Sequence, residues 1–229
     1  MFFFDTGLIL FVIPAFIFVM YAQNKVKGTY QKYVRVPSKR GFTGAQVARA
    51  LLDKSGLSDV RVEKSKGELS DHYDPRKKAV RLSPNVHDGT SIASLGIAAH
   101  ETGHAIQHAD GYFALSLRNM VFPAASFGSK LGVPLFFIGF IFAEGMGTTF
   151  MDLGIALFFF AVLFQIITLP VEFNASTRAV AALEGGGYLT SDEVKPTKQV
   201  LNAAAMTYVA ATAMALAQLL RLIMLRGRR

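Results

Sequence analysis

The sequence predicts a mainly α-helical integral membrane protein with three or four transmembrane helices and a water-facing α+β module that holds a small β-sheet. Hydrophobic residues make up 52% of the 229 residues and charged residues only 17%, which argues against an ordinary soluble domain. Several apolar runs are long enough to cross a bilayer. Residues 23–99 hold 15 Lys and Arg against 7 Asp and Glu, and this excess equals the net charge of the whole chain, +8.

The first apolar run, residues 2–22, has about the length of a membrane span and contains a single charge, Asp5. No basic residue precedes Lys25 and no small-residue cleavage site ends the run, so we expect an anchor helix over residues 1–22 rather than a cleaved signal peptide. Seven basic residues follow before the first acid, Asp53. The positive-inside rule therefore places the next segment in the cytoplasm.

Residues 23–118 are expected to form this cytoplasmic module. Thr43 is the predicted N-cap of a short helix that Gly56 ends. Residues 60–63 and 78–82 alternate between apolar and polar, with the turn-forming Asp74-Pro75 between them, so we expect a small sheet with one hairpin. A further helix is predicted from residue 90 or 91 to about residue 109.

The remaining chain is expected to return to the membrane. Residues 119–170 predict a transmembrane hairpin whose short link has acidic but no basic residues. Residues 171–202 are polar and are placed in the cytoplasm. Residues 203–229 form an apolar helix with a basic tail; a fourth span would put this tail outside, so the helix is expected either to cross the membrane or to pack on the module.

The motif His-Glu-Thr-Gly-His at residues 100–104 has the H-E-x-x-H pattern. On a helix, His100 and His104 lie on one face and reach one zinc ion, while Glu101 stands beside the open position of the metal as a general base. The alternative is two histidines on a helix surface with a solvated glutamate. The chain has no cysteine, so histidines and carboxylates must supply all the metal ligands.

A catalytic zinc site needs a third protein ligand. His108 lies about 12 Å along the helix from His100, too far to share the ion unless the helix breaks. Glu172 follows the third apolar run, on the side of the membrane where the topology places His100 and His104, and is the favoured ligand. Glu184 is the alternative carboxylate.

Four stretches occur in a characteristic order: Asp71-His72-Tyr73-Asp74-Pro75, Val80-Arg81-Leu82-Ser83, Ala99-His100-Glu101 and Glu172-Phe173-x-Ala175-Ser176. In these stretches the chain resembles the YugP-type membrane zinc metallopeptidases. More remotely it is similar to the HtpX-like gluzincins, in which two His and a Glu of E-x-x-A-D bind zinc. The resemblance implies a zincin-like module, peptidase activity and one zinc ion. Ser176 replaces the acid of that pattern, which leaves Asn174, Ser176 or a water to orient a ligand histidine.

The transition state also needs a donor or a cation near the developing oxyanion. Arg178, His72, Tyr73 and Tyr188 are the candidates. Arg178 suits an ion pair equally well. His72 and Tyr73 precede the predicted hairpin, whose edge strand is suited to binding an extended peptide, although a solvated turn is the alternative.

These features favour a zinc endopeptidase in the plasma (inner) membrane that cuts membrane or membrane-associated proteins on the cytoplasmic side. One alternative is an intramembrane protease of the site-2 kind, with Asp152 in a sequence that only loosely resembles its L-D-G signature. Another is a zinc-binding scaffold or transporter without enzymatic activity. The expected partners are a protein substrate and the lipid bilayer. Nucleic acid is not expected, because the basic residues adjoin a membrane span. The sequence does not predict an oligomeric state.

Overall fold

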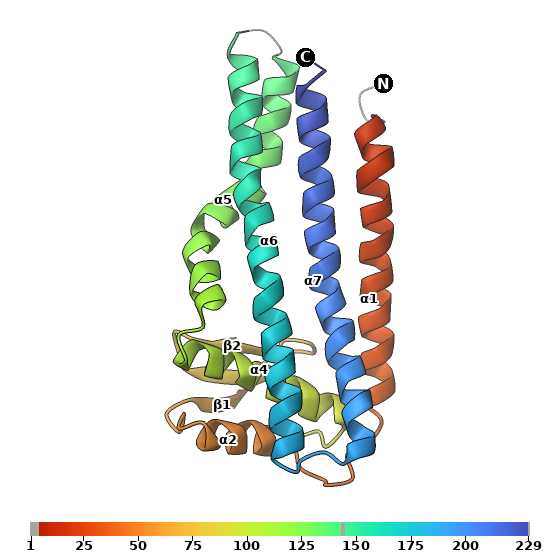
Figure 1. Ribbon diagram of the computed structural model, residues 1–229, viewed down its shortest axis with the longest axis vertical. Coiled ribbons are helices and arrows are strands. Elements are labelled where there is room, and N and C mark those ends of the chain that lie inside the picture. Colours follow the sequence, from red (N-terminus) through yellow and green to blue (C-terminus); the bar gives the residue numbers. More distant parts are fainter. Residues whose placement is uncertain (1–4, 143–144, 229) are drawn as a thin grey trace. The chain divides into compact units, whose positions relative to one another are not determined.

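The computed structural model describes residues 5–142 and 145–228 (Figure 1). A π-helical turn, Leu8–Val12, leads into α1, Ile13–Tyr33. The later long helices are α5, Phe113–Ile141, α6, Met146–Gly185, and α7, Ser191–Arg226. Each of these four helical stretches is long and apolar enough to cross a membrane. With a three-stranded sheet beside them, they confirm the expected class of a mainly helical protein with a small sheet.

The chain forms two compact units. The membrane unit comprises Met1–Gln23, Ala114–Pro170 and Thr207–Arg229, and the module comprises Asn24–Phe113 and Val171–Met206. In the module, α2, Gly44–Lys54, begins at the predicted cap: the Thr43 hydroxyl accepts the Gln46 backbone N–H in a capping box. Ser55 ends this helix and Gly56 follows with a φ of 71°, in the left-handed region expected there.

The sheet contains one hairpin, as expected, but not between the two strands that the alternation indicated. It has the order β1-β3-β2, with β1 at Arg61–Lys64, β2 at His72–Asp74 and β3 at Ala79–Leu82. The two alternating stretches, β1 and β3, pair in parallel with Val62 opposite Val80. The hairpin joins β2 to β3 instead, and β2 is the edge strand. The small sheet with one hairpin is confirmed, but its first strand is β2 rather than the stretch at residues 60–63, because β2 contains only three residues, too few to show alternation.

Helix α4, Ile92–Ala109, lies at the centre of the module. Ser91 caps it by accepting the Ser94 backbone N–H. The helix is therefore capped where the sequence predicted its start, at residue 90 or 91. One apolar cluster joins α4 to α2, α6 and α7 through residues such as Leu95, Ala99 and Leu183. A second cluster joins α4 to α2 and the sheet through Ala98 and Val80. Because α4 is buried from both sides, its position is fixed by packing rather than by local propensity.

Helix α6 continues through Pro170 without a break, so the segment after residue 170 is the end of the same helix. In the membrane unit, α6 packs against α5 and α7 around Phe136, Met151 and Leu222.

Helix α7 is also continuous, and its arginines are paired within the membrane unit. The Arg221 guanidinium lies 2.8 Å from the Asp5 carboxylate, and the Arg226 Nε lies 2.7 Å from Asp152 Oδ1.

Candidate metal centre

Two imidazoles and a carboxylate converge in the module. His100 and His104 lie one turn apart on α4, with ring centroids 4.7 Å apart and planes inclined at 84°. Glu172 projects from α6, and its Oε2 lies 3.3 Å from His100 Nε2 and 3.6 Å from His104 Nε2. The three ligand atoms all lie within 4.8 Å of one another, and Glu172 is only 4% exposed. The structure therefore brings together the three residues that the sequence favoured as ligands.

The spacing of these atoms fits a tetrahedral zinc ion. Zinc binds imidazole nitrogen and carboxylate oxygen at about 2.0–2.2 Å, so two ligand atoms of a tetrahedral site lie about 3.3–3.6 Å apart. The two distances from Glu172, 3.3 and 3.6 Å, agree with this value. Two nitrogens and one oxygen also form the donor set of a catalytic zinc site that keeps a fourth position open.

Gln107 holds His104 in one tautomer. The amide of this fully buried residue donates from Nε2 to the Val171 carbonyl oxygen and to Asn174 Oδ1, each at 2.9 Å. Its Oε1 therefore accepts from His104 Nδ1 at 3.0 Å. With the proton on Nδ1, the lone pair on Nε2 faces Glu172 and is free to bind a metal.

Ser176 lies beside the Nδ1 atom of His100, as Gln107 lies beside that of His104. Its hydroxyl oxygen lies 3.2 Å from His100 Nδ1. Ser176 and Asn174 were two candidates for the role of the missing acid, and the structure gives each a place: Ser176 contacts one histidine directly, and Asn174 supports the other through Gln107. A serine is a weaker acceptor than a carboxylate, so His100 is held less strongly than in the acid-containing pattern.

Gly103 lets α4 approach α6 closely at this point. A Cβ at Gly103 would lie 3.0 Å from the Ala175 carbonyl oxygen, which is tighter than ordinary packing allows. A side chain here would push apart the helix that carries the histidines and the helix that carries Glu172.

Glu101 and Glu172 also set the electrostatics of His104. Burial lowers the pKa of the His104 imidazole, but its hydrogen bond to Glu172 and the charges of Glu101 and Glu172 outweigh burial, with a contribution from Gln107. The pKa of His104 therefore lies above its ordinary value. Without a metal the site attracts protons, and a divalent ion must compete with them.

The comparisons with known proteins agree with this chemistry. Residues 8–227 match the family described as "putative neutral zinc metallopeptidase". The chain belongs to this family. It is also 47% identical, over 205 residues, to the "Putative membrane protease YugP" of Bacillus subtilis (strain 168), a match that covers 90% of each chain. No solved structure matches the chain. As a member of a zinc metallopeptidase family with four apolar helices, the chain is a multi-pass membrane protein of zinc-peptidase type.

Arg178 shares a hydrogen-bond acceptor, Asn174, with Gln107. Its Nε donates to Asn174 Oδ1 at 2.9 Å and its Nη1 to Asp110 Oδ2 at 2.5 Å. A chain of hydrogen bonds thus runs from Asp110, at the end of α4, through Arg178 and Asn174 to Gln107 and His104. Arg178 thus forms an ion pair with Asp110, which was the predicted alternative to a contact with the oxyanion.

His72 and Tyr73 lie on the edge strand β2. The Tyr73 hydroxyl lies 3.0 Å from His108 Nδ1, and the two rings are in contact. His108 is thus a polar residue in the last turn of α4, one turn beyond His104, and is not part of the group of convergent ligand atoms. His72 Nδ1 bonds to the Ser70 carbonyl oxygen at 2.8 Å.

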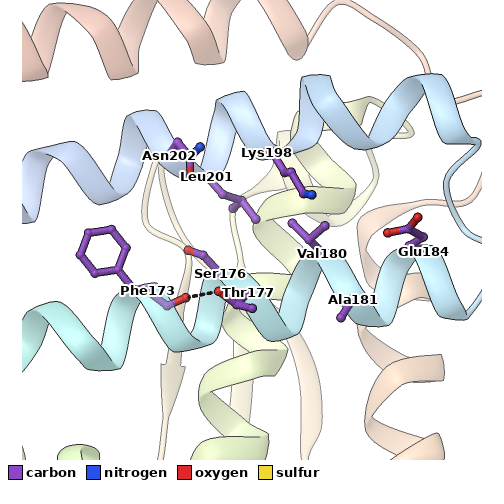
Figure 2. A pocket seen from close by; sticks show the side chains of 9 residues that line it. All are labelled: Phe173, Ser176, Thr177, Val180, Ala181, Glu184, Lys198, Leu201 and Asn202. Carbon is purple, nitrogen blue, oxygen red and sulfur yellow. Dashed lines mark hydrogen bonds between the residues drawn. The ribbon is translucent and has the colours of Figure 1, made fainter.

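The other candidates lie elsewhere in the module. Glu184 and Lys198 line a pocket of about 370 Å³ between α6 and α7 (Figure 2). Tyr188 packs its ring edge-on against Phe42. Gln107 was missed as a functional residue because its role depends on contacts with residues 64 and 67 positions later, and only its position one turn after His104 hinted at it.

Proposed function

We propose that the chain is a membrane-anchored endopeptidase in which His100, His104 and Glu172 bind one zinc ion. The observation that supports this best is the distance of Glu172 Oε2 from the two Nε2 atoms, 3.3 and 3.6 Å. The substrates are membrane or membrane-associated proteins. The site faces the cytoplasm at the plasma membrane, as the basic residues after the first apolar run indicate.

A bound zinc ion would lower the pKa of a coordinated water towards neutrality and polarise the scissile carbonyl. Glu101 is the proposed general base and is 9% exposed, within the same buried turn as the two histidines. Its carboxylate accepts the proton of the attacking water and returns it to the leaving amine. Gln107 and Ser176 hold the Nδ1 sides of the two histidines, so that both Nε2 atoms stay directed at the ligand position.

The substrate backbone is proposed to bind along β2. This strand pairs with β3 on one side only, so its other edge is available to add an extended peptide by backbone hydrogen bonds. His72 and Tyr73 on this strand are the proposed substrate-binding residues, since Tyr73 contacts the last turn of α4. Arg178 acts on the site through Asn174 and Gln107.

An intramembrane protease of the site-2 kind is not favoured. Its second metal-binding acid would be Asp152, but the carboxylate of Asp152 is engaged by Arg226 at 2.7 and 3.1 Å. Glu172 would supply the third protein ligand without it.

Zinc content and peptide cleavage together test the proposal. Purified wild type should hold one zinc per chain, and His104→Ala and Glu172→Ala should each lose it. Glu101→Gln should keep the zinc and lose cleavage by at least ~100-fold, because the base is removed and the ligands are not. Glu184→Gln is the matched control for Glu172, and should keep both zinc and cleavage.

Full zinc occupancy in Glu172→Ala would overturn the ligand set. Unchanged cleavage in Glu101→Gln would overturn the role of the base. Zinc binding in wild type without any cleavage of membrane-protein substrates would favour a zinc-binding scaffold.

A further inference from the structure

A groove in the module lies between the start of its α1 segment and α7. It has a volume of about 590 Å³, and its α1 wall is formed by Lys25, Gly28, Thr29 and Lys32. These residues recur every three or four positions and share one face of the helix. The facing wall on α7 includes Gln199, Asn202, Ala203 and Met206, with the same spacing. The volume lies within the range of small-molecule sites.

The groove is cationic and lacks a neutralising acid. In the part of the chain that the structure describes, no Asp or Glu lines it. Across residues 5–142 and 145–228, neither Lys25 nor Lys32 has an ion pair with a carboxylate. Three lysines elsewhere in the module do: Lys39 pairs with Asp192, Lys64 with Asp88 and Lys78 with Asp59, at 2.6–2.8 Å. The charge of the groove is therefore available to an anionic ligand.

The groove also changes in polarity along its length. The two helices run antiparallel here (Figure 1), so the end near Asn24 lies opposite Ala203 and Met206, and the other end lies at Gln199. That far end is closed by the Tyr33 hydroxyl, which donates to Gln199 Oε1. The Lys32 ammonium lies 4.9 Å from the centre of the Tyr33 ring. The end near Asn24 thus combines Lys25 with the apolar side chains of Ala203 and Met206, and the far end combines Lys32 with the polar groups of Tyr33 and Gln199.

The groove begins on α1 at the depth of the lipid headgroups and extends beyond them. Lys25 follows the end of the apolar run, residue 22, by about 4.5 Å along the helix, and Thr29 by about 10 Å. The headgroup layer is about 5–8 Å thick on each side of the hydrocarbon. Side chains on a helix lean towards its N-terminus, so Lys32, at about 15 Å, leans back towards this layer.

We propose that this groove binds the phosphate headgroup of an anionic glycerophospholipid. The phosphate lies between Lys25 and Lys32 and accepts from the Thr29 hydroxyl and the Asn202 amide. Gly28 leaves room for it, since nothing lies within 4 Å of the place where its Cβ would be. The glycerol and acyl end of the lipid lies towards Ala203 and Met206. This site is independent of the proposed metal centre.

Lipid retention by the purified full chain in a neutral detergent tests the proposal. Native mass spectrometry would compare phosphatidylglycerol, phosphatidylcholine and inorganic phosphate as ligands. The wild type should retain phosphatidylglycerol in preference to phosphatidylcholine. Lys25→Gln with Lys32→Gln should weaken this binding about 30-fold, since each lysine near an anionic headgroup contributes about fivefold.

Two variants separate the site from general charge. Lys54→Gln with Lys66→Gln removes the same charge from exposed lysines outside the groove and should bind as the wild type does. Lys25→Arg with Lys32→Arg keeps the charge and should stay within about threefold of wild type. Equal retention of both lipids, binding of inorganic phosphate as tight as that of phosphatidylglycerol, or equal losses in the groove and control variants would overturn the proposal.

Discussion

Replacing Gln107 by Leu isolates the effect of holding His104 in place. Leu has a similar volume but cannot accept from His104 Nδ1 or donate to Val171 and Asn174. The imidazole then loses the bond that sets its tautomer. Loss of such a partner typically weakens metal binding 10–100-fold, or about 1.4–2.7 kcal/mol. We expect zinc affinity in the variant to fall within this range.

The dissociation constant for zinc would be measured at one pH by competition between the apo-protein and a chromophoric chelator. The absorption spectrum of the cobalt-substituted protein reports the geometry of the site independently of activity. Gln107→Glu retains an acceptor for His104, so it should recover most of the affinity, even though it places a carboxylate beside two oxygens and lowers thermal stability.

Thr197→Val is the control for stability alone. Thr197 is fully buried and donates to the Glu193 carbonyl oxygen, away from the convergent ligands. It should lower the melting temperature and leave zinc affinity unchanged. Zinc affinity in Gln107→Leu within twofold of wild type would refute the positioning role, and so would an equal loss of affinity in Thr197→Val.

Three further outcomes are expected. Gly103→Ala should cost about 1–3 kcal/mol of stability and weaken zinc binding, because the added methyl separates α4 from α6. Gly185→Ala is the control, since its methyl would meet no described neighbour, and it should change neither quantity. Calorimetry measures the stability, and the same competition assay measures the zinc affinity. Asp5→Asn should destabilise the chain more than Asp152→Asn does, because the ion pair of Asp5 with Arg221 is part-buried, whereas the exposed pair of Asp152 with Arg226 contributes about 0–1 kcal/mol; similar losses in denaturant titrations would contradict this. Burial raises the pKa of the Asp71 carboxyl above its unfolded value, although Ser83 donates hydrogen bonds to it. Ionisation of Asp71 therefore lowers the free energy of unfolding at neutral pH. This destabilisation disappears as the pH falls through the raised pKa. The melting temperature of wild type relative to Asp71→Asn should therefore rise as the pH falls from neutrality, and parallel pH profiles would reject the shift.

The main parts of the fold could be predicted from the sequence because their signals are local. Apolar runs of spanning length predicted the long helices, and Thr43 and Ser91 lie at the helix starts that their capping chemistry indicated. The spacing of His100 and His104 by one helical turn is equally local, because four residues bring two side chains to one face of a helix.

Contacts between distant residues decided the rest. The sequence favoured Glu172 through a topological argument, but its distance from the histidines depends on how closely α4 packs on α6 at Gly103. Gln107, Asn174 and Arg178 form one hydrogen-bonded chain only because the ends of two helices lie side by side.

The sequence by itself determined the long helices of this protein and the pairing of His100 with His104 on one helix face, since both follow from patterns within one segment. Only the tertiary structure decided the strand order β1-β3-β2, the partner that fixes each histidine and the place of Arg178. These depend on side-chain packing between segments up to 76 residues apart, as between Ser176 and His100, and no short pattern encodes such packing.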